Sequence, residues 1–340
     1  MRAPKKEILH QNELQIPKEF LRFATPAGVA AYRAERMKCN TIAEIGCGIG
    51  AQTIAFASTC KKVIAIEIDG NMLNIAKESA KKLGINNIEF IDGDALFDGN
   101  IKKIKTHKPD IIFCDTQRKE SGERSIDDLK PDIRKLIGEY GKISDKIAIE
   151  VPPYTNDLSR LEEDFEKEFI SVDRKLNRLT LYFNKLKKCE RSAVALPEKA
   201  RIEDEKHMGK MRAAETASVF KYLYIIDPAV SMAELADRLG EDFKADIIEM
   251  GKKFYFVSNE NIKSAFLEPY RIVSVTKPDA ESILESLKKL KAGKVVLRYT
   301  IPPEDYWKER KMYESQLKGD EKYHLFKSDE EAILCESLSY

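Results

Sequence analysis

Three glycines occupy alternate positions in residues 43–50, A-E-I-G-C-G-I-G, directly after a run of apolar residues. This order places residues without a Cβ between a predicted strand and a predicted helix, where the backbone must come close to a ligand. The N-terminus of that helix would face the same ligand. A dinucleotide-binding loop would read G-x-G-x-x-G. Here the third glycine comes one residue early and Glu44 precedes the first, which favours S-adenosylmethionine (SAM) over a nicotinamide cofactor or a turn that binds nothing.

Acidic residues follow the next two predicted strands, and each can hold one part of an adenosine. Glu67 ends the second strand, where a carboxylate can accept hydrogen bonds from both ribose hydroxyls, as it also would in a nicotinamide enzyme. Asp94 follows the third strand. It is either an ordinary turn aspartate or the acceptor for the adenine amine, and the second role is typical of SAM enzymes. Glu44 can help to orient the methionine amino group. We therefore expect these residues to contact the cofactor: Glu44, Gly46, Cys47, Gly48, Gly50, Glu67, Ile68, Asp94, Ala95 and Asp115.

The fourth predicted strand ends at D-T-Q-R, residues 115–118. The reactive end of a cofactor lies at the carboxyl ends of the central strands of an open α/β sheet, so these residues should face the methyl group. We assign Asp115 as an acceptor that positions the substrate and Arg118 as a contact to its phosphate or base. V-P-P-Y, residues 151–154, is similar to the motif of enzymes that methylate exocyclic amines, but it follows the fifth strand. Tyr154 is therefore assigned either to stacking on a substrate base or to packing.

Apolar runs alternate with helical patterns along the first half of the chain, as strands and helices do in a parallel sheet. This rhythm predicts an α/β fold with a doubly wound, Rossmann-like sheet of seven strands. The predicted strands are 41–45, 63–68, 87–91, 110–114 and 146–151, with 179–183 and 192–196 closing the sheet as a hairpin.

The charges of the chain are nearly balanced. Its 340 residues are enough for two domains, and 58 Lys and Arg residues stand against 57 Asp and Glu residues. There is no overall basic excess, so a nucleic-acid site must be a local patch. The segment 174–191 is one candidate, because it holds seven basic residues and one acid. It is either a solvated strand face or a phosphate-facing surface beside the site.

Neither a metal site nor a membrane segment is expected. The six cysteines include no C-x-x-C pair and the four histidines are scattered, which argues against zinc. The N-terminus has no apolar signal region, and no apolar run approaches the ~18 residues that cross a bilayer. These features predict a cytoplasmic protein.

Several segments together are similar to the class I SAM-dependent methyltransferases that carry a C-terminal THUMP-like domain. They are A-T-P at 24–26, D-T-Q-R at 115–118, G-E-R at 122–124, E-R-S-A at 190–193 and D-P-A-V at 227–230. The family has D-P-A-R-R where this chain has D-T-Q-R. Residues 63–94 also resemble the trimethylguanosine-synthase group of RNA guanine methyltransferases.

The resemblance implies a SAM-dependent methyltransferase that acts on structured RNA, with a guanine of tRNA favoured and rRNA next. Two other hypotheses remain: a methyltransferase for a small molecule or protein, and a non-catalytic protein that binds SAM or RNA. The expected division of the chain is an N-terminal helical lead-in at 1–36, a methyltransferase domain at 37–197, a linker at 198–214 and a THUMP-like α+β domain at 215–340 that helps to hold the RNA.

Overall fold

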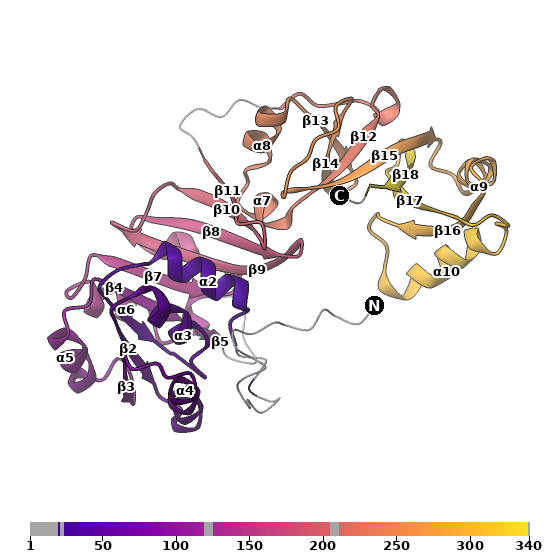
Figure 1. Ribbon diagram of the computed structural model, residues 1–340. Helices are drawn as coiled ribbons and strands as arrows, with labels where there is room; N and C mark the ends of the chain where they lie inside the picture. The colour runs from indigo at the N-terminus through magenta and orange to yellow at the C-terminus, as the bar shows by residue number, and fades with distance from the viewer. Residues whose placement is uncertain (1–19, 21–23, 119–124, 205–210, 339–340) are drawn as a thin grey trace. The chain divides into compact units, whose positions relative to one another are not determined.

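The apolar runs of the first half form parallel strands in the computed structural model, which describes residues 20, 24–118, 125–204 and 211–338. The chain divides into two units, Met1–Glu203 and Asp204–Tyr340, and each has its own large sheet (Figure 1). The helices and strands of the first unit are α2 (Ala27–Arg36), β1 (Thr41–Ile45), α3 (Ala51–Thr59), β2 (Lys62–Glu67), α4 (Gly70–Lys82), β3 (Ile88–Asp92), α5 (Asp98–Thr106), β4 (Ile111–Asp115), β5 (Gln117–Arg118), β6 (Leu129–Lys130), α6 (Ile133–Tyr140), β7 (Lys146–Val151), β8 (Phe165–Val172), β9 (Lys175–Asn184), β10 (Arg191–Leu196) and β11 (Ala200–Glu203).

The first sheet has nine strands within the described residues, in the order β11-β10-β8-β9-β7-β4-β1-β2-β3. The last five of these run parallel, and the chain leaves β1 through β2 and β3 before it returns to the other side of β1 at β4. The neighbouring residues Val63 and Ile64 are both fully buried, so both faces of these strands are covered, as in a doubly wound sheet. The predicted α/β fold is confirmed, with nine strands rather than seven.

Two helices, α2 and α3, cover one face of the central strands. Phe56 of α3 meets Phe113 of β4 edge to face, with ring centroids 5.4 Å apart. Ala34 and Met37, in α2 and at its end, belong to the same buried cluster. The helix expected as a lead-in is therefore part of the core of the first unit.

The predicted hairpin between 179–183 and 192–196 is wrong. These runs lie in β9 and β10, but β8 is placed between them, antiparallel to β9 and parallel to β10. Sequence reasoning missed β8 because Glu166 and Glu168 occupy positions whose side chains are fully buried. The last strand, β11, pairs with β10 and so extends the sheet into the stretch expected as a linker.

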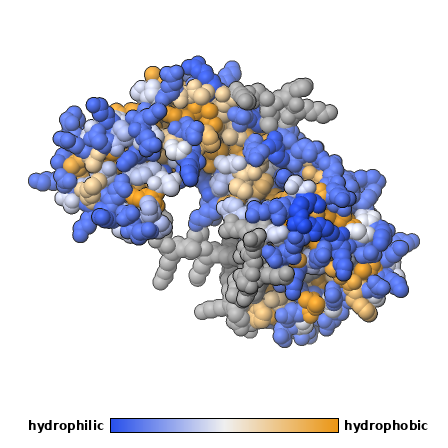
Figure 2. Space-filling model, turned by 180° about the vertical axis from the view of Figure 1, so that it is seen from behind, coloured by the Kyte–Doolittle hydropathy of each residue, from blue (hydrophilic) through white to orange (hydrophobic). Residues whose placement is uncertain are grey.

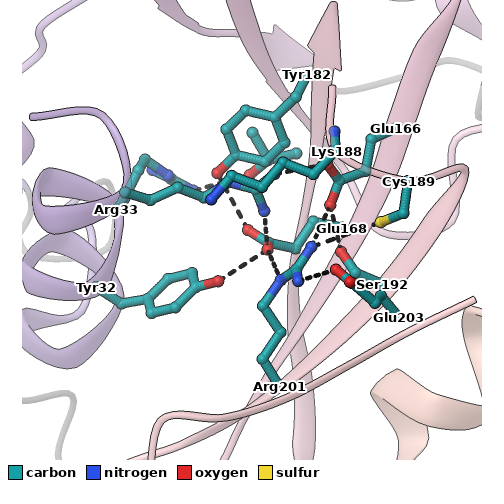
Figure 3. Close-up of polar contacts among 12 residues, drawn as sticks. Tyr32, Arg33, Glu166, Glu168, Tyr182, Lys188, Cys189, Ser192, Arg201 and Glu203 are labelled. Carbon is teal, nitrogen blue, oxygen red and sulfur yellow. Dashed lines mark hydrogen bonds and ion pairs between the residues drawn. The ribbon is translucent and has the colours of Figure 1, made fainter. Parts of the chain in front are cut away.

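Arg36 and Arg201 compensate the buried carboxylates of β8. Of these two arginines, Figure 3 labels Arg201, which lies beside Glu166 and Glu168. Arg36 of α2 binds Glu166 at 2.7 Å and also binds Glu168, and Arg201 of β11 binds Glu166 at 3.0 Å. Burial alone would raise the pKa of Glu166, but Arg36 and the hydrogen bonds to its carboxylate lower it to about 2. Three hydroxyls also donate to these carboxylates, from Tyr32 and Tyr182 to Glu168 and from Ser192 to Glu166.

The second unit holds a seven-stranded sheet in the order β13-β14-β12-β15-β18-β17-β16 within the described residues. Neighbouring strands are antiparallel except for β16 and β17. Its elements are β12 (Tyr222–Ile226), α7 (Pro228–Met232), α8 (Ala236–Phe243), β13 (Asp246–Met250), β14 (Lys253–Ser258), β15 (Leu267–Thr276), α9 (Ala280–Lys289), β16 (Ala292–Leu297), α10 (Pro303–Glu314), β17 (Glu321–Lys327) and β18 (Ala332–Ser337).

Alternate residues of β17 and β18 face two separate cores. Leu325 and Leu334 pack with α9 and α10, whereas Phe326 and Ile333 pack in a second cluster with Tyr255 of β14. The ring of Tyr255 meets that of Phe326 edge to face at 5.4 Å, although three strands lie between β14 and β17 in the sheet. The sheet therefore curls over itself, and α9 and α10 cover its other face.

Candidate functional site

The predicted site residues meet at the carboxyl edge of the parallel strands. Ile45, the last residue of β1, is level with Ile66 on one side and with Cys114 on the other. The residues that follow these three are Gly46, Glu67 and Asp115, so they lie side by side at the strand tips. Strand β3 ends level with Glu67, which brings the turn containing Asp94 to the same edge.

The glycine loop between β1 and α3 bends through three left-handed residues. The φ angles of Gly46, Gly48 and Gly50 are +76°, +55° and +84°. A Cβ on Gly46 would lie 2.9 Å from the carbonyl oxygen of Asp115, and one on Gly50 would lie 2.9 Å from the Cβ of Ala76. A Cβ on Gly48 would meet nothing within 4 Å. The outer two glycines thus allow close packing of the loop, while the middle one faces open space where a ligand can approach.

Glu67 fixes the shape of this loop. Its buried carboxylate accepts hydrogen bonds from the backbone N–H of Gly48 at 2.8 Å, of Ile68 at 2.9 Å and of Asp69 at 3.0 Å. A carboxylate has about four acceptor positions, so the orientation is set by the backbone and capacity remains for a ligand hydroxyl. Cys47, within the loop, is buried, and its N–H donates to the carbonyl of Ile66 at 3.1 Å.

Apolar side chains stand exposed beside the expected adenine position. Ile68, directly after Glu67, has 68% of its surface exposed, and Phe97 has 64%. Asp94 is exposed and its carboxylate accepts from the N–H of Leu96 at 2.8 Å, while Ala95 is buried. Two exposed apolar residues that follow adjacent strands suit the faces of a flat aromatic ring. Sequence reasoning named Ile68 but missed Phe97, whose signal was a lone aromatic in a polar turn.

The three residues assigned to catalysis lie on neighbouring strands. Asp115 ends β4 and is half-buried, and Tyr154 follows the adjacent strand β7 with half of its side chain exposed. The backbone of Arg118 lies in β5, which pairs with β6, and its side chain lies outside the described part of the chain. Between them, the hydroxyl of Thr116 donates to the carbonyl of Glu150 at 2.7 Å. This bond ties the turn after β4 to β7. Thr116 stands where the family that the sequence resembles has proline.

A buried arginine lies beneath this edge. Arg33 of α2 is fully buried and donates to Glu150 at 2.5 Å and to Gln52 at 3.2 Å. Its positive charge also interacts with the carboxylates of Asp115 and Glu44. Arg33 therefore offsets part of the negative charge collected at the strand tips. The sequence placed it in a lead-in helix and gave no signal that it approaches the site.

Residues 42–125 match the family described as a methyltransferase domain. The chain contains a class I SAM-dependent methyltransferase domain. A probable ribosomal RNA small subunit methyltransferase A from Methanosphaera stadtmanae is 34% identical over 122 residues, which are 36% of this chain and 42% of that protein. The 23S rRNA (uracil(747)-C(5))-methyltransferase RlmC of Vibrio vulnificus is 30% identical over 131 residues, which are 36% of this chain and 32% of that protein. The chain thus spans less than half the length of these curated relatives.

A solved structure matches both units of the chain. The crystal structure of a "putative methyltransferase from Porphyromonas gingivalis W83" has a TM-score of 0.75 and covers 94% of this chain and 82% of that one. Its sequence identity is 18%, so the likeness is one of fold. The second unit therefore also has a counterpart of known structure.

The methyltransferase domain has the charge distribution that its cofactor needs. SAM is the cofactor of this family, and it carries a cationic sulfonium and an ammonium group. Glu44 is buried, and one of its carboxylate oxygens has no hydrogen-bond partner among the described residues. Burial, with a further contribution from the neighbouring carboxylates of Asp115 and Glu67, raises the pKa of Glu44 to about 8. A cation placed here would relieve both the repulsion and the unmatched acceptor, so the residues fit SAM.

Three cations of the basic segment 174–191 form ion pairs within the methyltransferase domain. Lys185 pairs with Asp145 at 2.5 Å, and Lys187 pairs with Asp164 at 2.5 Å and with Glu190. Arg178 pairs with Glu150 at 2.6 Å, directly beneath the site. A structural role is therefore favoured for these three cations, and the segment has less free charge to offer to phosphates than its composition suggests.

A cavity of about 430 Å³ lies in the second unit and contains none of the predicted site residues. Its lining includes five carboxylates, from Glu215, Glu249, Asp329, Glu330 and Glu331. Such a lining disfavours a polyanion. Among the described residues, no group of three or more His, Cys, Asp or Glu side chains is arranged to hold a metal ion. Within the described residues of both units, no helix is both long enough and apolar enough to cross a membrane.

Proposed function

We propose that this protein transfers the methyl group of SAM to RNA. The observation that carries methyl transfer is the meeting of Glu44, Glu67 and Asp115 around the open side of the glycine loop. Three carboxylates at one sheet edge are costly without a cation, and SAM supplies both a cation and ribose hydroxyls. When bound, SAM supplies an activated methyl group on a good leaving group.

The chain's own residues bind and align the reactants. Glu67 accepts from the ribose, Asp94 accepts from the adenine amine, and Ile68 covers one face of the adenine ring. Glu44 attracts the cationic end of the cofactor. Asp115 and Tyr154 hold the acceptor base in line with the methyl group, which is the main requirement for such a transfer.

One relative, from Methanocaldococcus jannaschii, is named a probable cobalt-precorrin-6B C(15)-methyltransferase, but most relatives with a named substrate are RNA methyltransferases, so RNA is the proposed acceptor. Two of them are named for ribosomal RNA, and a further relative from Clostridium tetani is named an uncharacterized RNA methyltransferase. The finer prediction from the sequence is a guanine of tRNA, held with the help of a THUMP-like second unit. The named relatives instead favour rRNA, so both RNA classes belong in the test.

The test is transfer of labelled methyl from SAM to unmodified tRNA and rRNA transcripts, followed by mass spectrometry of the nucleosides. Labelled nucleosides are expected in one of the two pools, and their identity names the methylated atom. Glu67→Gln should abolish transfer, whereas Glu78→Gln, an exposed carboxylate on α4, should not. SAM binding without transfer to either pool would refute the RNA acceptor. Absence of SAM binding would refute methyl transfer altogether.

A further inference from the structure

The second unit contains a local excess of positive charge that the overall composition conceals. Residues 288–318 hold nine Lys and Arg residues and four Asp and Glu residues, whereas the whole chain is nearly balanced. Three of the nine form ion pairs: Lys289 with Glu285, Arg298 with Glu268 and Arg310 with Glu314. The other six are exposed and form no ion pair with any described residue; they are Lys288, Lys291, Lys294, Lys308, Lys311 and Lys318.

Helix α10 presents an aromatic side chain among these lysines. Trp307 has 68% of its surface exposed, which is unusual for so large an apolar residue. Lys311 is four positions further along the helix and therefore lies beside Trp307, while Lys308 is three positions before Lys311 and neighbours that lysine; all three side chains are exposed. We call Trp307, Lys308 and Lys311 the α10 face. Arg310 lies over one face of the indole ring, with its guanidinium carbon 5.3 Å from the ring centroid.

The opposite side of α10 is firmly anchored, so the α10 face is held in place. Tyr313 is buried in the core shared with α9 and the sheet. The carboxylate of Glu314 accepts from the N–H of Val295 in β16 at 3.0 Å, which ties the end of the helix to the neighbouring strand. Tyr306 packs edge to face against Trp307, with ring centroids 5.4 Å apart. The exposed indole therefore has a fixed orientation, as a binding platform requires.

Further free lysines continue from the end of α10 to the start of β16. The N–H of Gly319 donates to the carbonyl of Ala292 at 3.1 Å, so the turn after α10 lies against the first residues of β16. Lys318 and Lys291 each precede one of these two residues in the sequence, which places them near one another. Hydrophilic side chains, in blue, cover much of the surface visible in Figure 2, with hydrophobic patches, in orange, between them.

We propose that the α10 face binds unpaired nucleotides of the RNA substrate, with a base stacked on Trp307 and phosphates held by Lys308 and Lys311. Single-stranded nucleic acid is bound by aromatic side chains that stack on bases and by cations that follow the backbone. Lysine is depleted at protein–protein interfaces, so the same surface is less suited to a protein partner. The inference rests on the proposed RNA acceptor. It adds α10 as an RNA contact to the segment 174–191, where Arg178, Lys185 and Lys187 are paired with acids.

Trp307 is the single tryptophan of the chain, so its fluorescence reports on this face directly. The full-length protein is titrated with a single-stranded oligouridine of about twelve nucleotides, a length that a binding groove of this kind covers. Stacking of a base on the indole should quench the emission in a saturable way. A flat emission signal while the RNA binds by another readout, such as anisotropy of a labelled oligonucleotide, would overturn the stacking.

Two sets of variants test the face without relying on fluorescence. Trp307→Leu should weaken RNA binding about tenfold, because stacking on one aromatic side chain contributes that much or more. Lys308→Gln combined with Lys311→Gln should lower the slope of log affinity against log salt by about 1.4, since each phosphate contact on a single strand contributes about 0.7. The matched control is Lys185→Gln combined with Lys187→Gln, whose cations are already paired and should leave affinity and slope unchanged.

The outcomes separate this inference from the proposed function. Wild-type methyl transfer to RNA with unchanged binding in the α10 variants would refute the α10 face and leave the function standing. Quenching and loss of binding in the α10 variants, without methyl transfer to any RNA, would support the face and refute the proposed acceptor. Unchanged binding in both sets of variants, with wild-type circular dichroism spectra, would refute the inference outright.

Discussion

Replacing Glu44 with glutamine should remove the part of the pH dependence of SAM affinity that comes from Glu44. The pKa of Glu44 is raised from 4.5 to about 8 by burial and by the nearby carboxylates, so near pH 7 only about one tenth of the protein has this group ionised. A cation binds best to the ionised form. The dissociation constant of wild type should therefore fall as pH rises from about 6 to above 8, by at most about tenfold for each pH unit, because one pKa unit corresponds to about 1.4 kcal/mol.

The glutamine variant gives the matched baseline. Glutamine keeps the shape of the side chain and cannot ionise, so its SAM affinity should lack this dependence. The amino group of SAM also titrates near pH 8, but it does so equally for both proteins. The two affinities should converge at about pH 6 and separate above about pH 8, by the roughly 1.5–3 kcal/mol that a charge-assisted contact contributes.

Isothermal titration calorimetry measures this coupling in two buffers with different ionisation enthalpies. Wild type should release close to one proton more than the variant on binding SAM near neutral pH. The same group sets the sign of a stability effect without ligand. The folded protein holds a proton on Glu44 between pH 4.5 and about 8 that the unfolded chain does not, so the free energy of unfolding should fall as pH rises through this range. Equal proton release and parallel stability profiles in the two proteins would refute this reasoning.

Three further predictions address other parts of the first unit. Gly48→Ala and Gly84→Ala should each destabilise by about 1 kcal/mol, since both glycines have positive φ and open surroundings, but only Gly48→Ala should lose SAM affinity; equal SAM affinities would exclude the loop as the cofactor site. Ile68→Ala should weaken SAM binding by roughly 1–2 kcal/mol without changing the melting temperature, because its exposed side chain is buried only by adenine; unchanged affinity in calorimetry would count against that contact. Arg36→Leu should destabilise by about 3–5 kcal/mol in urea titrations, because it leaves two buried carboxylates to share the single charge of Arg201. Wild type should itself lose stability as pH falls from 4.5 towards about 2, where Glu166 protonates. If Arg36→Leu loses the same amount of stability over this pH range, this account is contradicted.

Strand prediction succeeded where burial follows the local pattern. The bounds of β1 and β7 coincide with the predicted runs 41–45 and 146–151, because strands covered on both faces are mostly apolar, and a single glutamate in each did not hide the pattern. It failed at β8, whose buried glutamates look like surface residues in the sequence. Their burial is tolerable only because Arg36 and Arg201 arrive from elements far away along the chain. No local sequence pattern shows that these arginines lie beside the glutamates.

The properties of the candidate site also fall into two groups: positions that follow from the local sequence pattern and charge or exposure that depends on the fold. Parallel strands bring their carboxyl ends to one edge, so residues such as Glu67, Asp94 and Asp115 could be placed together from their positions at strand ends. The charge state of Glu44 could not be predicted, because it depends on burial and on carboxylates that converge only in the folded protein. Phe97 was missed because exposure of an aromatic residue is a property of the surrounding surface.

The sequence by itself determined the glycine loop, the alternation of strands and helices and the cofactor class, since these depend on residues close together in the chain. Only the tertiary structure decided which charges are free. Lys185 and Lys187 of the basic segment 174–191 are paired with acids from outside it, whereas Lys308 and Lys311 of α10 form no ion pair with a described residue. A count of charges cannot separate the two cases, because pairing depends on three-dimensional neighbours.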